Sequence, residues 1–132
     1  MRFLCDTNVL SELSRGTPNR RVLRWAEGVT EEIALSVVTV EEVYLGLMCR
    51  PQPRVQGWFE AFLERRCRVM AIDDQVARRA GQLRGRLSAE GKTRTQADML
   101  IAATVWVHRL TLVTRNERDF AGCEVAVLNP FA

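Results

Sequence analysis

The sequence predicts an α/β fold, a three-layer α/β/α sandwich with a short, mainly parallel sheet, formed by a single domain over residues 1–132. Short apolar runs alternate with longer segments in which apolar residues recur at helical spacing. Helices between successive strands require parallel pairing and cover both faces of the sheet. The length of 132 residues and the hydrophobic content of 47% also suit one domain of ordinary size.

The first elements follow from a buried apolar run and two capping signals. Residues 2–5 are expected to form a strand, because the run is short and ends at a carboxylate. A short helical turn is expected over residues 11–15. Thr17 or Asn19 then caps a helix that runs to about Glu27.

The second strand is expected over residues 33–36 and leads directly into a helix. Thr39 is predicted to cap this helix, with Glu42 at its third position, as in a capping box. The helix should extend to about Met48.

The middle of the chain continues the alternation. Residues 54–66 have apolar residues at helical spacing, and residues 69–72 predict a short strand. Asp73 is expected to cap the next helix, and Gly91 to end it.

The C-terminal third completes the predicted sheet. Thr95 opens a very apolar helix over residues 97–107, and residues 110–114 form a strand. A helical turn over residues 117–120 precedes a last strand over residues 125–128.

Acidic residues stand where these strands end or where the following helices begin. The four are Asp6, Glu42, Asp98 and Asp119. In open parallel sheets this edge is where sites form, and a helix N-terminus favours a nearby acid. Glu42 alone could be a capping residue, with Glu41 a competitor for its role, and Asp98 and Asp119 alone could be ordinary surface acids. A carboxylate that ends a buried strand, as Asp6 does, needs donors or a cation.

Four converging carboxylates repel one another unless a cation lies between them. Oxygen ligands favour a hard divalent ion, and such a site suggests phosphate chemistry. A zinc site is not expected, because the four cysteines are isolated and His108 is the only histidine. We expect the thiols to be free and His108 to be structural.

The charge and hydropathy patterns bear on where the protein is located and on what kind of partner it binds. No apolar run is long enough to cross a bilayer, and no secretory signal is recognisable at the N-terminus, so a cytoplasmic protein without a membrane partner is expected. The net charge is +3, and all of the 19 basic residues except Lys92 are arginines. Arginine binds phosphate in a bidentate way, so an RNA or DNA partner is permitted.

The residues around the four acids resemble the motifs of PIN-domain nucleases, in the same order and over nearly the whole chain. The matching segments are residues 4–12, 36–46, 97–103 and 114–120. In the second motif the acid precedes a glycine by four positions, which selects Glu42, before Gly46, over Glu41. The length resembles that of VapC toxins of bacterial toxin–antitoxin pairs, including FitB-type proteins.

The fourth motif leaves one assignment open. Many relatives have Asp at the position of Asn116, whereas others use the acid three residues later, here Asp119. We favour Asp119 as the fourth acid and Asn116 as a neutral ligand or a substrate-orienting amide. Thr7, Asn8, Thr114 and Asn116 are the candidates for residues that support the acids or orient the substrate.

The resemblance implies a Mg²⁺-dependent endoribonuclease, in which Mn²⁺ could substitute. Asp6 and Asp98 would bind the metal directly, and Glu42 and Asp119 would bind a second ion or hold metal-bound waters. Hydrolysis would leave 5′-phosphate and 3′-hydroxyl ends. The RNA target is open, and so is the number of metal ions.

The resemblance also implies partners. A cognate antitoxin should inhibit the enzyme, and the complex should bind operator DNA. A homodimer is expected through the helices that carry Trp58, Phe59 and Phe62 and Ala77, Ala80 and Leu83. The alternatives are a catalytically inactive PIN-like module that binds RNA or protein, a metal-dependent phosphatase, and a DNA-directed flap nuclease.

Overall fold

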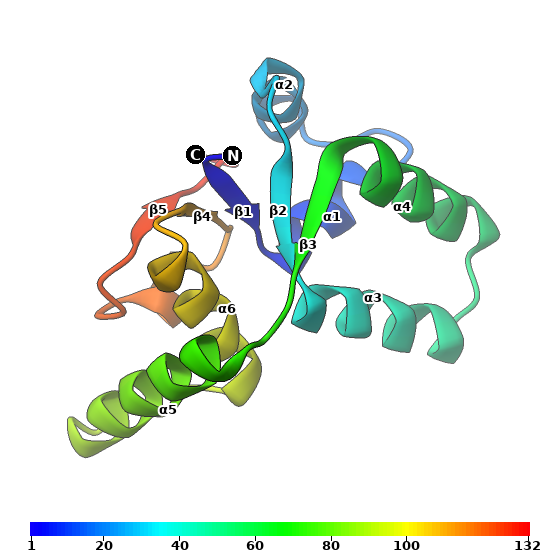
Figure 1. The fold of residues 1–132 in the computed structure, drawn as a ribbon. Coiled ribbons are helices and arrows are strands. Elements are labelled where there is room, and N and C mark those ends of the chain that lie inside the picture. The colour runs from blue at the N-terminus through cyan, green and yellow to red at the C-terminus, as the bar shows by residue number, and fades with distance from the viewer.

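The computed structural model describes all residues from Met1 to Ala132 and places a five-stranded sheet between helices (Figure 1). The strands are β1 (Phe3–Cys5), β2 (Ile33–Ser36), β3 (Cys67–Met70), β4 (Thr111–Val113) and β5 (Ala126–Leu128). Their order in the sheet is β3-β2-β1-β4-β5, and every pair is parallel. The predicted fold class is confirmed.

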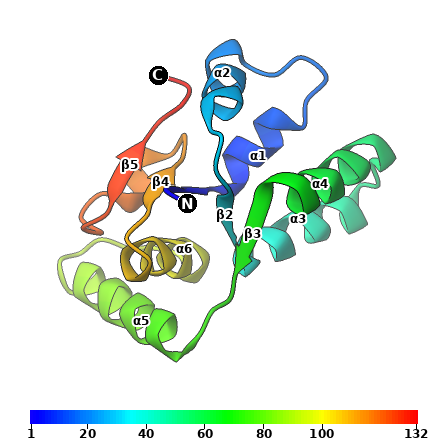
Figure 2. The same cartoon turned by 45° about the horizontal axis from the view of Figure 1, so that its top comes forward.

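Six α-helices and one 3₁₀ helix connect the strands. They are α1 (Thr7–Leu13), α2 (Arg20–Gly28), α3 (Val37–Cys49), α4 (Pro53–Arg66), α5 (Asp74–Ala89), α6 (Gln96–Val107) and η1 (Glu117–Phe120). Figure 2 shows α5 and α6 together on one side of the sheet, while α3 and α4 lie side by side at the other end of the molecule. None of these helices is both long enough and apolar enough to span a membrane.

Two apolar clusters, one on each face of the sheet, make the core. One contains Leu4 and Leu112 of the sheet and the buried stripes of α5 and α6. The other contains Cys5 and Leu35 of the sheet with buried residues of α1, α2 and α4. Alternate residues of one strand thus enter opposite clusters, as the pleat requires.

The cap of α3 was predicted wrongly. Ser36, the last residue of β2, caps the helix and accepts a 3.0 Å hydrogen bond from the Val38 backbone N–H. Thr39 lies inside the helix and is fully buried, and Glu42 lies in the second turn. The β2 strand therefore passes into α3 without a loop, a connection for which the Thr-x-x-Glu spacing gave no signal.

Other helix and strand boundaries differ by a few residues from the predicted ones. Helix α1 begins at Thr7 rather than at residue 11, because Asp6 itself accepts a hydrogen bond from the Thr7 N–H as the N-cap. Strand β3 spans Cys67–Met70 rather than residues 69–72, with Ile33 paired to Cys67. Asn19, not Thr17, caps α2.

Part of the apolar surface assigned to a dimer interface is used within the chain. Phe59, Ala80 and Leu83 are buried in the two core clusters. Trp58 and Phe62 remain only partly buried on α4 and stack with ring centroids 4.8 Å apart. The four cysteines are free, as expected.

Candidate active site

The candidate site lies at the carboxyl edge of the sheet, where β1, β2 and β4 end beside one another (Figure 1). Asp6 follows β1 and Thr114 follows β4, while β2 leads into α3, which carries Glu42. Asp98 lies in the first turn of α6. Parallel pairing therefore brings together motifs that are far apart in the sequence.

Asp6 is a buried carboxylate, 6% exposed, with three hydrogen-bond donors. Its Oδ1 accepts from the Thr7 backbone N–H at 2.8 Å. Its Oδ2 accepts from Asn8 Nδ2 at 3.0 Å and from the Thr114 hydroxyl at 2.8 Å. These donors hold the carboxylate in one orientation and offset the cost of burying its charge.

Asn8 and Thr114 form a small network around this carboxylate. Asn8 Nδ2 also lies 3.3 Å from Thr114 Oγ1, and Asn8 Oδ1 accepts from the Arg115 backbone N–H at 3.1 Å. Thr114 Oγ1 further accepts from the Asn116 N–H at 3.0 Å. The network ties the segment after β4 to the start of α1.

Glu42 is held by Thr7, the first residue of α1 and the residue that also donates to Asp6. The Thr7 hydroxyl donates to Glu42 Oε1 at 2.8 Å, and Thr7 Oγ1 lies 3.1 Å from Thr39 Oγ1. Glu42 is partly buried, whereas Glu41 is exposed. Glu42, unlike Glu41, is therefore joined by a hydrogen bond to the residue that follows Asp6.

Asp98 stands close enough to the other acids to feel their charges. Partial burial raises the pKa of its carboxyl, a hydrogen bond with Thr95 opposes the shift, and the charges of Asp6, Asp119 and Glu42 raise the pKa further. Thr95 also accepts from the Asp98 N–H at 3.1 Å as the N-cap of α6. The four predicted acids therefore share one electrostatic neighbourhood.

Asp119 is the most exposed of the four acids. It lies in η1, where its backbone carbonyl accepts a 2.6 Å hydrogen bond from Arg94. Asp119 and Asn116 both line an open hollow formed by residues 115–119. Both residues can thus reach solvent, and the choice between Asp119 and Asn116 as the fourth site residue stays open.

The donor set suits a hard divalent cation. No group of three or more Asp, Glu, His or Cys side chains is arranged to hold one ion. Mg²⁺, however, is commonly bound through one or two carboxylates and keeps several waters. Asp6 and Asp98 are the two acids expected to bind metal directly, and no basic side chain is among the causes of the raised pKa of Asp98.

The profile of the PIN domain matches residues 3–123. The chain belongs to the PIN-domain family. It is 36% identical to the toxin FitB of Neisseria gonorrhoeae, with 98% of each chain covered. It is 32% identical to VapC ribonuclease Y4jK of Sinorhizobium fredii, over 98% of this chain and 97% of the relative.

Solved structures that contain FitB and VapC proteins also resemble this chain. The FitAcB structure from Neisseria gonorrhoeae matches this PIN domain with a TM-score of 0.84 and 35% identity, covering 98% of both chains. The DNA-bound VapBC structure from Salmonella typhimurium matches with a TM-score of 0.88 and 25% identity, again covering 98% of both chains.

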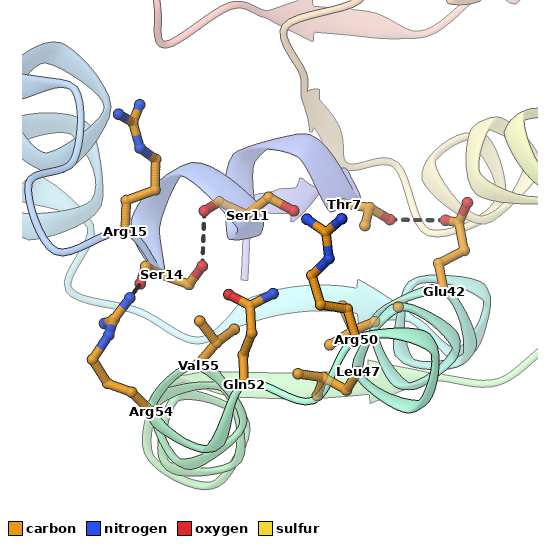
Figure 3. Close-up of a pocket in the computed structure, with 12 residues that line it drawn as sticks. Thr7, Ser11, Ser14, Arg15, Glu42, Leu47, Arg50, Gln52, Arg54 and Val55 are labelled. Carbon is orange, nitrogen blue, oxygen red and sulfur yellow. Dashed lines mark hydrogen bonds between the residues drawn. The ribbon is translucent and has the colours of Figure 1, made fainter.

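The sequence analysis missed two features of this PIN domain beside Glu42. Thr39 was predicted as a helix cap but contacts Thr7. A groove of about 410 Å³ also opens from Thr7 and Glu42 between α1 and the helices α3 and α4 (Figure 3). The groove contains Arg15, Arg50 and Arg54. Their convergence depends on how α3 and α4 turn back on each other.

Proposed function

We propose that this chain is a metal-dependent endoribonuclease that acts as the toxin of a type II toxin–antitoxin pair and hydrolyses RNA phosphodiester bonds. The observation that carries the proposal is that Thr7 links two of the acids: its backbone N–H donates to Asp6 Oδ1 at 2.8 Å, and its hydroxyl donates to Glu42 Oε1 at 2.8 Å. Partial burial first, and then the charges of Asp6, Asp119 and Glu42, raise the pKa of the Asp98 carboxyl. Clustered carboxylates beside an open groove suit a divalent ion and a phosphate substrate. The names toxin FitB and VapC ribonuclease of full-length relatives support the same activity.

Asp6 and Asp98 would hold Mg²⁺, or Mn²⁺ in its place, with Glu42 and Asp119 alongside. When bound, the ion would make a water more acidic and stabilise negative charge on the phosphate. Thr7, Asn8 and Thr114 orient Asp6 for this role through their hydrogen bonds to its carboxylate. Glu42, which the Thr7 hydroxyl orients, would accept a hydrogen bond from the attacking water.

Covalent catalysis by a thiol has little support. Burial raises the pKa of Cys5, which precedes Asp6, well above its usual value, and burial raises the pKa of Cys67 to about 12. Both thiols would therefore be protonated at neutral pH and poorly nucleophilic. Water activated among the acids is the better nucleophile.

The proposed partners are RNA and an antitoxin protein. Related structures are toxin–antitoxin complexes, one described as FitAB bound to a DNA fragment and another as DNA-bound VapBC. We propose that this chain likewise binds a cognate antitoxin, that the complex binds operator DNA, and that the toxin acts in the cytoplasm as a homodimer.

The test is cleavage of end-labelled RNA by purified protein with Mg²⁺, alongside Asp98→Asn purified in the same way. Cleavage that leaves 5′-phosphate and 3′-hydroxyl ends, and that disappears in the variant, is the expected result. A parent protein that binds RNA tightly but never cleaves it would instead favour the alternative, an inactive PIN-like binding module.

A further inference from the structure

We propose that the groove beside Glu42 binds a phosphate of the RNA strand next to the one that is cleaved, with Arg50 as the principal contact. We call it the arginine groove; it is the groove lined by Arg15, Arg50 and Arg54 on one side of Thr7 and Glu42 (Figure 3). This inference rests on the proposed function, because it assigns the path of the substrate.

The charge of the arginine groove favours an anion. Three arginines line it, and Glu42 is the only acid among the lining residues. Most of the remaining lining residues are polar or small, and only three are apolar: Val43, Leu47 and Val55. The lining residues therefore carry more positive than negative charge, which suits the phosphate backbone of a nucleic acid.

The three arginines are not equivalent. Arg15 is paired with Glu12 at 3.0 Å, so much of its charge is already compensated. Arg54 Nη2 donates to the Ser14 carbonyl at 2.9 Å, which holds this side chain against α1. Arg50 is exposed and forms no ion pair, so its guanidinium is free for a ligand.

The position of Arg50 connects the groove to the acids. Arg50 directly follows α3, and its side chain extends across the groove toward Thr7 and Ser11 of α1 (Figure 3). Thr7 is the residue whose hydroxyl holds Glu42. A strand with one phosphate among the acids would carry its neighbouring phosphate into this groove, where a planar guanidinium can bind two oxygens at once.

The experiment measures RNA affinity in the Asp98→Asn background, so that the RNA is not consumed. Fluorescence anisotropy of a labelled single-stranded RNA is recorded in Mg²⁺ over a series of salt concentrations. Arg50→Gln is compared with Arg78→Gln, a control whose guanidinium pairs with Asp74 at 2.8 Å. Arg78 belongs to α5, which Figure 1 shows apart from α1, α3 and α4. Arg50→Lys keeps the charge but not the bidentate geometry.

Arg50→Gln should raise Kd several-fold and reduce the salt slope by about 0.7, the value of one phosphate contact on a single strand. Arg50→Lys should restore the slope and only part of the affinity, and Arg78→Gln should match the parent. With Asp98 intact, Arg50→Gln should raise KM more than it lowers kcat.

Two outcomes would overturn the assignment. In one, the parent cleaves RNA but Arg50→Gln matches Arg78→Gln in Kd, salt slope and KM, which leaves the proposed function standing. In the other, Arg50→Gln keeps its RNA affinity and loses inhibition by the antitoxin, which makes the groove a protein docking surface. Absence of cleavage by the parent would instead count against the proposed function itself.

A different observation carries a second inference, which also rests on the proposed function. We infer that Thr39 is a positioning residue that orients Glu42 through Thr7. A hydroxyl has a single proton, and a carboxylate can only accept, so the Thr7 proton goes to Glu42 Oε1. At the 3.1 Å contact the Thr39 hydroxyl must then donate to Thr7 Oγ1. This chain of donors sets the direction of the Thr7 hydroxyl.

Thr104 shows what a threonine in a helix does without such a role. Like Thr39 it is fully buried in a helix, but its hydroxyl donates to the Leu100 carbonyl one turn earlier, at 2.8 Å. That bond stays within α6 and is usual for helical threonines. Thr39 and Thr104 are therefore suitable for comparison. The Thr39 hydroxyl bonds to Thr7 of another helix, which in turn bonds to Glu42, whereas the Thr104 hydroxyl bonds within its own helix.

The test compares Thr39→Val with Thr104→Val, which remove the same hydroxyl at nearly constant volume. Thr39→Val should lower kcat roughly tenfold, the effect of one hydrogen bond, with little change in KM. Thr39→Ser should restore kcat, and Thr104→Val should leave it unchanged. The rise in Tm caused by Mg²⁺, a readout independent of cleavage, should be smaller in Thr39→Val than in Thr104→Val.

Equal kcat and equal Mg²⁺-induced rises in Tm for the two valine variants would overturn this role. If Thr39→Val fails to fold, Thr39→Ala provides the same comparison against Thr104→Ala.

Discussion

The Thr114 hydroxyl donates a 2.8 Å hydrogen bond to the Asp6 carboxylate, although 108 positions separate the two residues. Strand pairing explains the contact. In the parallel register Cys5 lies opposite Val113, so the next residue of each strand emerges at the same edge of the sheet. The Asp6 N–H donates to the Val113 carbonyl at 2.9 Å and fixes this register up to the site itself.

Metal removal should stop catalysis. Because the clustered acids offer oxygen ligands only, EDTA should abolish RNA cleavage, and added Mg²⁺ or Mn²⁺ should restore it. The measurement is the initial rate on labelled RNA during metal titration. Full activity after exhaustive chelation would contradict the mechanism.

Asp98→Asn should stabilise the metal-free protein while abolishing cleavage. The folded-state pKa of Asp98 is raised from its ordinary value of 3.8, so the folded protein binds its proton more tightly than the unfolded chain does. The stabilisation is therefore complete at acid pH below that value and is lost as pH rises through the folded-state pKa. Denaturant melts in EDTA at a series of pH values should show that the free energy of unfolding of the parent declines in this way, and that the decline is smaller for Asp98→Asn. Identical pH profiles for the two proteins would count against a raised pKa of Asp98.

Glu42→Gln should reduce cleavage far more than Glu41→Gln. The two residues are adjacent, but Glu42 is partly buried and accepts a hydrogen bond from Thr7, whereas Glu41 is exposed. We expect a loss of at least about a hundredfold in kcat for Glu42→Gln, in the range for a positioned acid–base group, and less than about threefold for Glu41→Gln. A reversed order in steady-state kinetics would show that the other carboxylate serves the site.

The chain should form a homodimer. The stacked pair of Trp58 and Phe62 on α4 remains partly exposed after the core is filled, and burying such a pair would favour a two-fold contact. Light scattering at micromolar concentration should give twice the 15.0 kDa chain mass. Trp58→Glu should shift the protein toward monomer, and a parent that is already monomeric would contradict the prediction.

A cognate antitoxin should inhibit through a basic side chain placed among Asp6, Glu42 and Asp98. Such a group would compensate the charges that raise the Asp98 pKa and would compete with the metal. Its apolar residues are expected beside residues 11–27 and 39–48, where Met48 is 81% exposed. Co-expression with the antitoxin should suppress RNA cleavage, and changing its basic residue to Ala should restore it. The candidate antitoxin is the protein encoded by the gene next to this one. If that protein does not bind, the toxin–antitoxin pairing fails, but the proposed ribonuclease activity is unaffected.

Much of the fold could be predicted from local patterns. The alternation of apolar runs with helical periodicity indicates parallel strands, and Asp73 and Thr95 cap their helices as expected. An acid that ends a buried strand, as Asp6 does, must lie at the carboxyl edge of a parallel sheet. These features depend on interactions between near neighbours in sequence and on the handedness of the connections.

Other features required the tertiary structure. Ser36 and Thr39 are both suitable caps by sequence, and the point where β2 leaves the sheet decides between them. The pKa of Asp98 depends first on its partial burial and then on the charges of Asp6, Asp119 and Glu42. The arginine groove depends on how α3 and α4 lie against α1. The sequence by itself therefore determined which residues are the candidates for the chemistry, because strand ends and helix caps are local. Only the tertiary structure decided how the side chains are oriented and charged, because distances across the sheet edge depend on the packing of the whole chain.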